Sequence, residues 1–141
     1  MIAFTPVGHL HAAEIDQSTN PQCAIDFVGP VQSGDADKLL ALLESNHMVL
    51  PGGEGNDYRT KALCLNSQGG DFLEGQKIVR IVYESGVPTR LLPGSFCFSS
   101  CAFIFVAGRS LGGEWDGPDR GMGKTALLGF HAPYTAFNDG E

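Results

Sequence analysis

The residues best suited to chemistry lie in one short segment, Gly94–Gly108, which reads GSFCFSSCAFIFVAG. Two adjacent serines, Ser99 and Ser100, stand between two cysteines and directly before an apolar run. Serine is a favoured N-cap and glycine favours the position after a helix, so the pattern predicts a short buried helix beginning at the serines. A hydroxyl at that end has backbone N–H donors beside it and a dipole field that favours negative charge. Both features suit a nucleophile that forms an oxyanion.

The same serines also have a plainer interpretation. Ser99 would cap the helix by accepting a hydrogen bond from a backbone N–H of the first turn, which is a common role for serine. On this segment alone the cap is the favoured interpretation, so a nucleophile needs support from other parts of the chain.

Two further segments carry such groups. Gly69-Gly70 follows an apolar run, and its missing side chains would let backbone N–H groups approach a ligand. His131 ends another apolar run. In open parallel α/β sheets the working loops lie beyond the carboxyl ends of the strands. A serine, a histidine and an anion-binding turn at three strand ends would form an acyl-transfer site. Taken singly, the two glycines would be a simple turn and the histidine a packed or surface residue.

The intervening segments predict the elements that must position these groups. Strands are expected at Ala24–Val31, Ala62–Leu65, Pro88–Leu92 and Ala126–His131; helices are expected from Ser33-Gly34-Asp35 onwards, over Phe72–Ser85 with Asp71 as cap and Gly86 as end, and after Ser99. This alternation is typical of parallel βα units. Three segments are expected to be irregular: Glu14–Gln22 as a polar linker, and Met48–Thr60 and Arg109–Thr125 as glycine-rich loops.

Composition excludes several classes of function. The 141 residues suit one domain, and 16 acidic against 9 basic residues give a net charge of −7, which argues against a nucleic-acid partner. No apolar run is long enough to span a membrane. The GMGKT segment is not a phosphate-binding loop, because the motif needs glycine where Pro118 stands. Four cysteines favour disulfides or buried thiols over a metal site, and no cofactor is expected.

Three ordered motifs, LNSQGG, SCAFIFVAG and GFHAP, resemble the proteolytic subunit of Clp protease and its crotonase-like relatives. Those proteins carry an NSPGG loop, a helix that reads like SMGAFLLTAG from its serine onwards, and a strand ending in IHQP. Aligning the shared Ala-Gly pair implies that Ser99 is the nucleophile and His131 the general base. The same match implies an oxyanion hole made by the N–H groups of Gly69 and Ser100.

The resemblance is nearest to a Clp-like group of exported bacterial proteins with a Cys-x-Ser-x-Cys nucleophile region, matched here by Cys97 to Cys101. An exported protein meets an oxidising compartment, so a disulfide is expected, with Cys97–Cys101 the favoured pair. Met1–Ala13 resembles the tail of a secretory signal peptide, although no basic region precedes it. A periplasmic or exported location is therefore expected.

The implied fold is an α/β domain of Clp-protease or crotonase-like ββα-type repeats with a parallel sheet, covering residues 23–141 after an N-terminal segment of residues 1–22 and lacking its C-terminal part. Two departures from the family pattern stand out. Gln68 replaces the loop proline, and the family's aspartate would lie well after the histidine, with Asp139 too near to His131 to match it.

The function expected from the residues and the resemblance together is serine-type hydrolysis of a peptide or protein substrate, and the resemblance adds a homo-oligomer as a further expectation. Three alternatives stay open: a non-catalytic module for binding or assembly, a thiol-dependent role of Cys97 and Cys101, and an acyl-thioester enzyme that binds coenzyme A and does not need Ser99.

Overall fold

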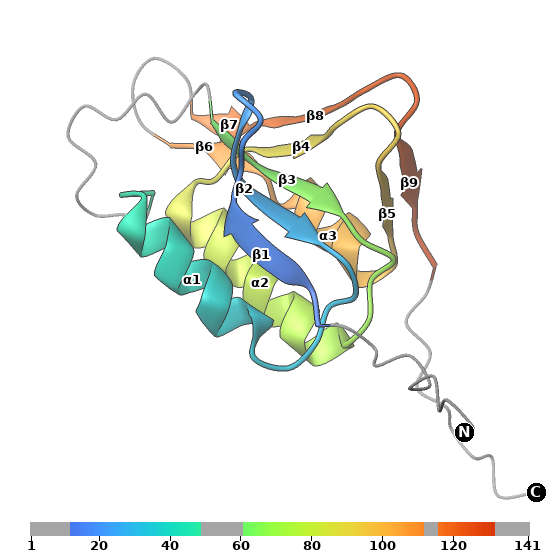
Figure 1. Ribbon diagram of the computed structural model, residues 1–141, viewed down its shortest axis with the longest axis horizontal. Helices are drawn as coiled ribbons and strands as arrows, with labels where there is room; N and C mark the ends of the chain where they lie inside the picture. The colour runs from blue at the N-terminus through green and yellow to red at the C-terminus, as the bar shows by residue number, and fades with distance from the viewer. Residues whose placement is uncertain (1–11, 49–60, 112–115, 132–141) are drawn as a thin grey trace, which may run out of the picture.

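The computed structural model describes residues 12–48, 61–111 and 116–131. Its centre is a five-stranded sheet in the order β1-β2-β3-β4-β8 (Figure 1). The strands are β1 (Glu14–Gln17), β2 (Cys23–Val28), β3 (Ala62–Asn66), β4 (Thr89–Leu91) and β8 (Arg120–Met122). β1 is antiparallel to β2, and all the other neighbours are parallel. The fold is therefore mixed α/β with a mostly parallel sheet.

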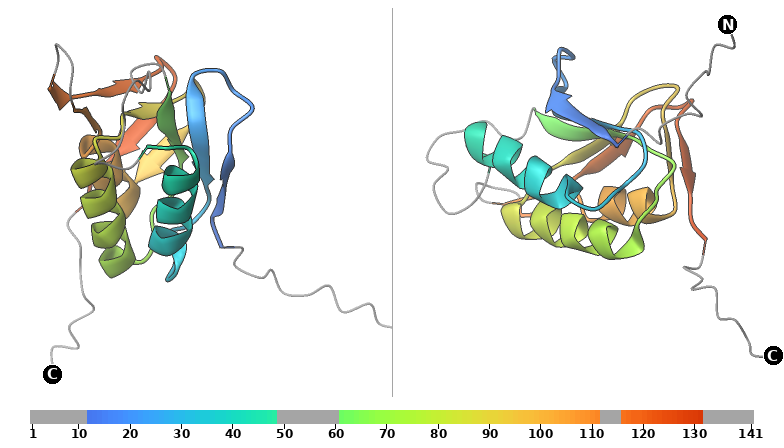
Figure 2. Two further views of the ribbon diagram at one scale, coloured as in Figure 1. Left: turned by 90° about the vertical axis from the view of Figure 1, so that its left-hand side faces the viewer. Right: turned by 60° about the horizontal axis from the view of Figure 1, so that its bottom comes forward.

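Three helices cover one face of this sheet: α1 (Asp35–Ser45), α2 (Phe72–Ser85) and α3 (Ser100–Val106) (Figure 2). The sequence marks both ends of α2. Asp71 accepts a hydrogen bond from the Glu74 N–H at 2.9 Å, and Gly86 takes the left-handed conformation that ends the helix. Ile78 and Val82 point from α2 into the core, as the helical spacing predicts.

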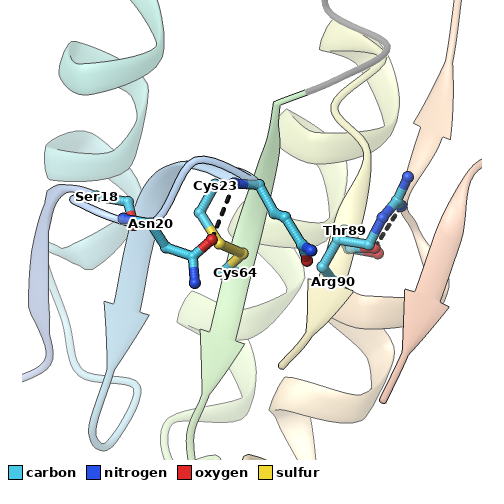
Figure 3. Close-up of a disulfide and its surroundings, with 7 residues drawn as sticks. Ser18, Asn20, Cys23, Cys64, Thr89 and Arg90 are labelled. Carbon is cyan, nitrogen blue, oxygen red and sulfur yellow. Dashed lines mark hydrogen bonds between the residues drawn. A yellow bond between two sulfur atoms is a disulfide. The ribbon is translucent and has the colours of Figure 1, made fainter. Parts of the chain in front are cut away.

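The core lies between the sheet and the helices. Its largest fully buried side chains come from both layers and include Ile25, Phe27, Leu39, Leu43, Leu63, Leu65, Ile78 and Ile104. All four residues Ala62–Leu65 of β3 are buried, which is typical of a central parallel strand. A disulfide between Cys23 and Cys64 joins β2 to β3 (Figure 3).

Two short strand pairs extend the structure. β5 (Phe96–Phe98) runs parallel to β9 (Leu127–Gly129), with Phe98 opposite Gly129. An isolated parallel bridge between Ser67 and Cys97 joins the end of β3 to β5. In Figure 1, β5 and β9 lie together beyond one end of the large sheet. The second pair, β6 (Arg109–Ser110) and β7 (Gly117–Pro118), is antiparallel.

Three expectations from the sequence are corrected by these strands. The linker assignment is wrong for Glu14–Gln17, because β1 pairs along its whole length with β2 and buries Ile15. The loop assignment of Arg109–Thr125 is wrong in part, since it contains β6, β7 and β8. The third corrected expectation concerns β5, which stands where a turn was expected to lead directly into the helix. All of these strands are short, β6 is the polar pair Arg109–Ser110, and β7 and β8 contain glycine or proline, so apolar patterning does not reveal them.

The remaining irregular segments lie mainly outside the described residues. Most of the segment that resembles a signal peptide falls in residues 1–11, and most of the Met48–Thr60 connection falls in residues 49–60. Asp139 also lies outside the described residues. Within the described part of the chain, no helix has the length and apolar character needed to cross a bilayer.

Candidate functional site: a strained serine between a strand and a helix

Ser99 occupies the single residue between β5 and α3, and its backbone is strained. Its φ of 58° and ψ of −126° lie outside the allowed wells of an L-residue, including the left-handed helical well. Such a conformation costs about 1–3 kcal/mol and persists only where the surroundings enforce it. The Ser99 side chain makes no capping hydrogen bond to α3. The plainer interpretation from the sequence, a helix cap, is therefore wrong.

Ser100 has the opposite character. Its side chain is buried, and its hydroxyl oxygen finds no hydrogen-bond partner among the described residues. It packs against α2, where a Cβ added to Gly75 would approach the Ser100 Cβ to 2.8 Å. What Ser100 can offer a ligand is its backbone N–H, because the first residue of a helix has no acceptor within that helix. Of the two serines, only Ser99 keeps a half-exposed side chain.

The Gly69-Gly70 turn lies directly against this segment. Gly69 has a φ of 87°, and a Cβ added there would meet the Phe98 carbonyl oxygen at 2.6 Å and the Ser99 Cβ at 2.7 Å. Gly70 has a φ of 151°, and its added Cβ would meet the Val31 carbonyl oxygen at 2.3 Å. Both positions thus require glycine for two reasons, the backbone conformation and the close approach of a second chain segment.

The hydrogen bonds of this turn involve the Gly69 N–H, the oxyanion donor expected from the sequence. This N–H donates to the hydroxyl oxygen of Ser67 at 3.1 Å. The Gly69 carbonyl accepts from the Val31 N–H at 2.9 Å. In a trans peptide the carbonyl and the following N–H point in opposite directions, so the Gly70 N–H points away from Val31, towards the side of β3 where Ser99 lies.

Gly70 and Ser67 are the site residues that sequence reasoning missed. Among the described residues no acceptor is bonded to the Gly70 N–H. Ser67 is fully buried at the end of β3, and its backbone bonds on both sides to β5: its N–H donates to Phe96 and its carbonyl accepts from Phe98. A serine two residues before a glycine is a signal for such a local hydrogen bond. The motif alone does not reveal which N–H remains available.

His131 lies two residues beyond the end of β9. The strand before it is held beside Ser99, because the Ser99 N–H donates to the Gly129 carbonyl at 3.0 Å. His131 is exposed, as is its neighbour Phe130, whose ring contacts Phe103 of α3 edge-on at 5.9 Å between centroids. The structure therefore brings the ends of β3, β5 and β9 to one edge, with Gly69, Ser99 and His131 on the segments that follow them.

The cysteines are all engaged in disulfides, Cys97–Cys101 and Cys23–Cys64. The first is the pair favoured from the sequence. Cys23, Asp26 and Cys64 also lie close enough together to share a metal ion, but two of these three ligands are consumed by the disulfide. A thiolate is required for cysteine to bind zinc, so the oxidised protein offers no such ligand here.

No family model matches the chain, and no curated protein sequence matches it. Among solved structures, a mutant of the 1510-N membrane-bound stomatin-specific protease is similar, with 16% sequence identity and a TM-score of 0.40. The match covers 59% of this chain but only 38% of that protein's chain.

Two buried carboxylates, Glu74 and Asp35, lie at the start of α1. Glu74 of α2 accepts hydrogen bonds from the backbone N–H groups of Gly34 and Ala36, at 3.1 and 2.9 Å, and so caps α1 from a neighbouring helix. Asp35 is buried beside it and accepts from the Gln32 N–H at 2.8 Å. Burial raises the pKa of Asp35, and the charge of Glu74 acts in the same direction.

The structure also has a hollow away from these residues. It has a volume of about 650 Å³ and lies along α1 and α2, where its lining includes Lys77, Arg80 and Glu84. Arg80 and Glu84 form an exposed ion pair at 3.9 Å. This lining contains no serine, histidine or cysteine, so it does not offer the nucleophile and base of a serine- or cysteine-type hydrolase.

Proposed function

We propose that the protein is a serine hydrolase of the peptidase type, with Ser99 as nucleophile and His131 as general base. The observation that carries the proposal is the strained backbone of Ser99 at a strand-to-helix turn. The same device exposes the nucleophile in hydrolases whose serine stands on a sharp, strained turn of this kind. An ordinary helix cap has no need of such strain.

The reaction follows from the groups around Ser99. As the Ser99 hydroxyl oxygen attacks a substrate carbonyl carbon, His131 takes the hydroxyl proton and the carbonyl oxygen becomes an oxyanion. His131 then gives this proton to the leaving amine, and an acyl-enzyme remains on Ser99. Water, activated by His131 in turn, releases the acid and restores the serine.

Two backbone N–H groups are available for the oxyanion in this proposal. One belongs to Ser100 at the start of α3, and the other belongs to Gly70, which replaces the Gly69 donor expected from the sequence. Two preorganised donors aimed at a developing oxyanion contribute more to the rate than to substrate binding, because the charge exists only in the transition state.

Labelling by a fluorophosphonate tests the proposal. The native chain should react at one site, and Ser99→Ala should abolish the reaction. Ser100→Ala is the matched control: it removes a neighbouring hydroxyl that is buried and unpaired, while the Ser100 N–H survives the substitution. His131→Ala should slow labelling by about 100-fold or more, since an unassisted serine is a poor nucleophile.

Labelling confined to Ser100 would show that Ser100, and not Ser99, is the nucleophile, and it would reject the roles proposed for the two serines. A chain that is folded but shows no labelling would favour the alternative from the sequence, a non-catalytic module. The thiol-dependent alternative loses its basis in the oxidised protein, because Cys97 and Cys101 are buried and joined to each other.

A further inference from the structure

A disulfide spans the turn that carries Ser99. Cys97 is the central residue of β5 and Cys101 is the second residue of α3, and the two Cα atoms are 5.2 Å apart. Ser99 is the middle residue of the five-residue ring of chain that the bond closes. Both cysteines are fully buried, so the bond lies on the inner side of the turn while the Ser99 side chain is half-exposed.

The strained backbone of Ser99 needs local restraints, and the disulfide is one of them. The strand side of the turn is held by two backbone hydrogen bonds, from Phe98 to Ser67 and from Ser99 to Gly129. The helix side has a bond from the Ala102 N–H to the Ser99 carbonyl. The disulfide joins the two sides covalently and fixes where α3 begins relative to β5.

We propose that the Cys97–Cys101 disulfide is a positioning element for the proposed nucleophile. It holds the Ser99 hydroxyl and the Ser100 N–H in fixed relation to each other, because these groups belong to the two residues on either side of the strand–helix boundary. The inference rests on the proposed function for its catalytic consequence, but the restraint on the Ser99 backbone can be measured without any activity.

Two observations separate this role from general stabilisation and from redox regulation. A disulfide stabilises a fold less as the loop that it closes becomes shorter, and here the two cysteines are only 4 residues apart in sequence, against 41 for Cys23 and Cys64. A regulatory disulfide must also be reached by an attacking thiolate, whereas Cys97 and Cys101 are fully buried. The bond therefore acts as a permanent local restraint.

The second disulfide provides a matched control within the same chain. Figure 3 shows this pair between β2 and β3. Cys23 is the first residue of β2, whereas Val31, which bonds to the glycine turn, follows the other end of that strand. Both cysteines of this pair are also buried in the core. Replacing it by two alanines removes a buried disulfide from the fold without touching the strand–helix turn at Ser99.

The experiment compares the full-length double variants Cys97→Ala/Cys101→Ala and Cys23→Ala/Cys64→Ala. We expect the first to lose about 100-fold in the second-order rate of fluorophosphonate labelling, because small displacements of a reacting group cost that much. The second should label within about 3-fold of the native chain at a temperature where it is folded. Thermal midpoints should fall in the reverse order, further for the second variant than for the first.

A second readout needs no activity. In the native chain and in Cys23→Ala/Cys64→Ala, backbone scalar couplings should report a positive φ at Ser99, and the Ser99 amide should be protected from exchange. In Cys97→Ala/Cys101→Ala the protection should fall by about 10-fold or more, without a matching change in the central strand β3.

These readouts separate the two hypotheses. A native chain that does not label contradicts the proposed function. The scalar couplings and the amide exchange at Ser99 still test whether the disulfide restrains its backbone. Equal labelling and equal Ser99 exchange in the two variants would overturn the positioning role. A Cys97→Ala/Cys101→Ala chain that fails to fold would also overturn it, because the bond would then act on the whole fold.

Discussion

At the residue scale, the strain at Ser99 is the feature that most clearly distinguishes this turn from an ordinary helix start. Glycine is the residue that adopts such φ values without a Cβ penalty. A non-glycine residue in this conformation lowers the stability of the fold, and such residues cluster at functional sites. That cost is measurable.

We expect Ser99→Gly to be more stable than Ser99→Ala, by about 1 kcal/mol in the free energy of unfolding. Both variants lack the hydroxyl, so the difference reports the backbone alone. Urea denaturation of the two purified chains measures it. At a residue with negative φ the order would be reversed, because glycine adds freedom to the unfolded chain; a reversed order would therefore contradict the strained geometry.

The turn at Gly69 allows a second comparison. Gly69→Ala should lower the free energy of unfolding by about 1–3 kcal/mol more than Gly94→Ala. The two glycines have similar φ values, 87° and 82°, so the conformational penalty is shared. An added Cβ at Gly94 meets nothing within 4 Å, whereas at Gly69 it meets Phe98 and Ser99. Equal losses would show that the close contact of Gly69 with Phe98 and Ser99 is absent.

At the element scale, the start of α1 depends on a carboxylate supplied by α2. Glu74 satisfies N–H groups that an isolated α1 would leave open, and Gly34, at the N-cap position, has no side chain to do so. The two helices are thus joined at the ends that face the glycine turn. The cost of this arrangement is a second buried carboxylate, Asp35, beside the first.

Asp35 gives stability a specific dependence on pH. Its pKa is raised, chiefly by burial, with Glu74 adding to the shift and the Gln32 N–H and Lys38 opposing it. The folded chain therefore binds the Asp35 proton more tightly than the unfolded chain, and stability is gained as the pH falls through the raised pKa.

Asp35→Asn should consequently stabilise the protein at neutral pH relative to the native chain. The advantage should shrink as the pH is lowered through the raised pKa towards the ordinary value of about 3.9. Asp37→Asn, in the same helical turn but exposed, is the control and should show no such trend. Denaturation midpoints measured from pH 7 to pH 3 test this, and an advantage that does not change with pH would contradict it.

Helix α2 could be predicted from the sequence, whereas strand β5 could not. α2 was predicted at both ends because capping chemistry is local: one aspartate, one glycine and an apolar stripe determine it. β5 was not predicted, since Phe96 to Phe98 is a strand only through its partners in β9 and at Ser67. The two serines illustrate the same limit. From the sequence, only the resemblance predicts which serine is the nucleophile. The difference in their exposure arises in the fold, because α2 packs against Ser100 and leaves Ser99 half-exposed.

At the scale of the whole molecule, one disulfide joins β2 to β3 within the large sheet and the other joins β5 to α3, and no cysteine is left free. Disulfides persist in oxidising compartments. We therefore propose an extracytoplasmic location, which the sequence also predicts from the resemblance to exported proteins and from the segment that resembles a signal peptide.

The thiol count tests the redox state directly. Protein purified from its native compartment and alkylated in denaturant without reductant should carry no alkyl groups, and the same protein after reduction should carry four. Mass spectrometry of the intact chain distinguishes the two. Four alkylated cysteines before reduction would contradict the disulfides and, with them, the inference about Ser99.

The pairing of β5 with β9 has a consequence for the time at which the protein becomes active. Ser99 emerges from the ribosome about 30 residues before β9 is complete, and until then its N–H lacks the Gly129 carbonyl that holds it in the folded chain. Under the proposed function, a growing chain therefore contains its nucleophile but neither the strand beside it nor the base that follows. Such a hydrolase cannot attack other proteins, or itself, until synthesis has passed His131.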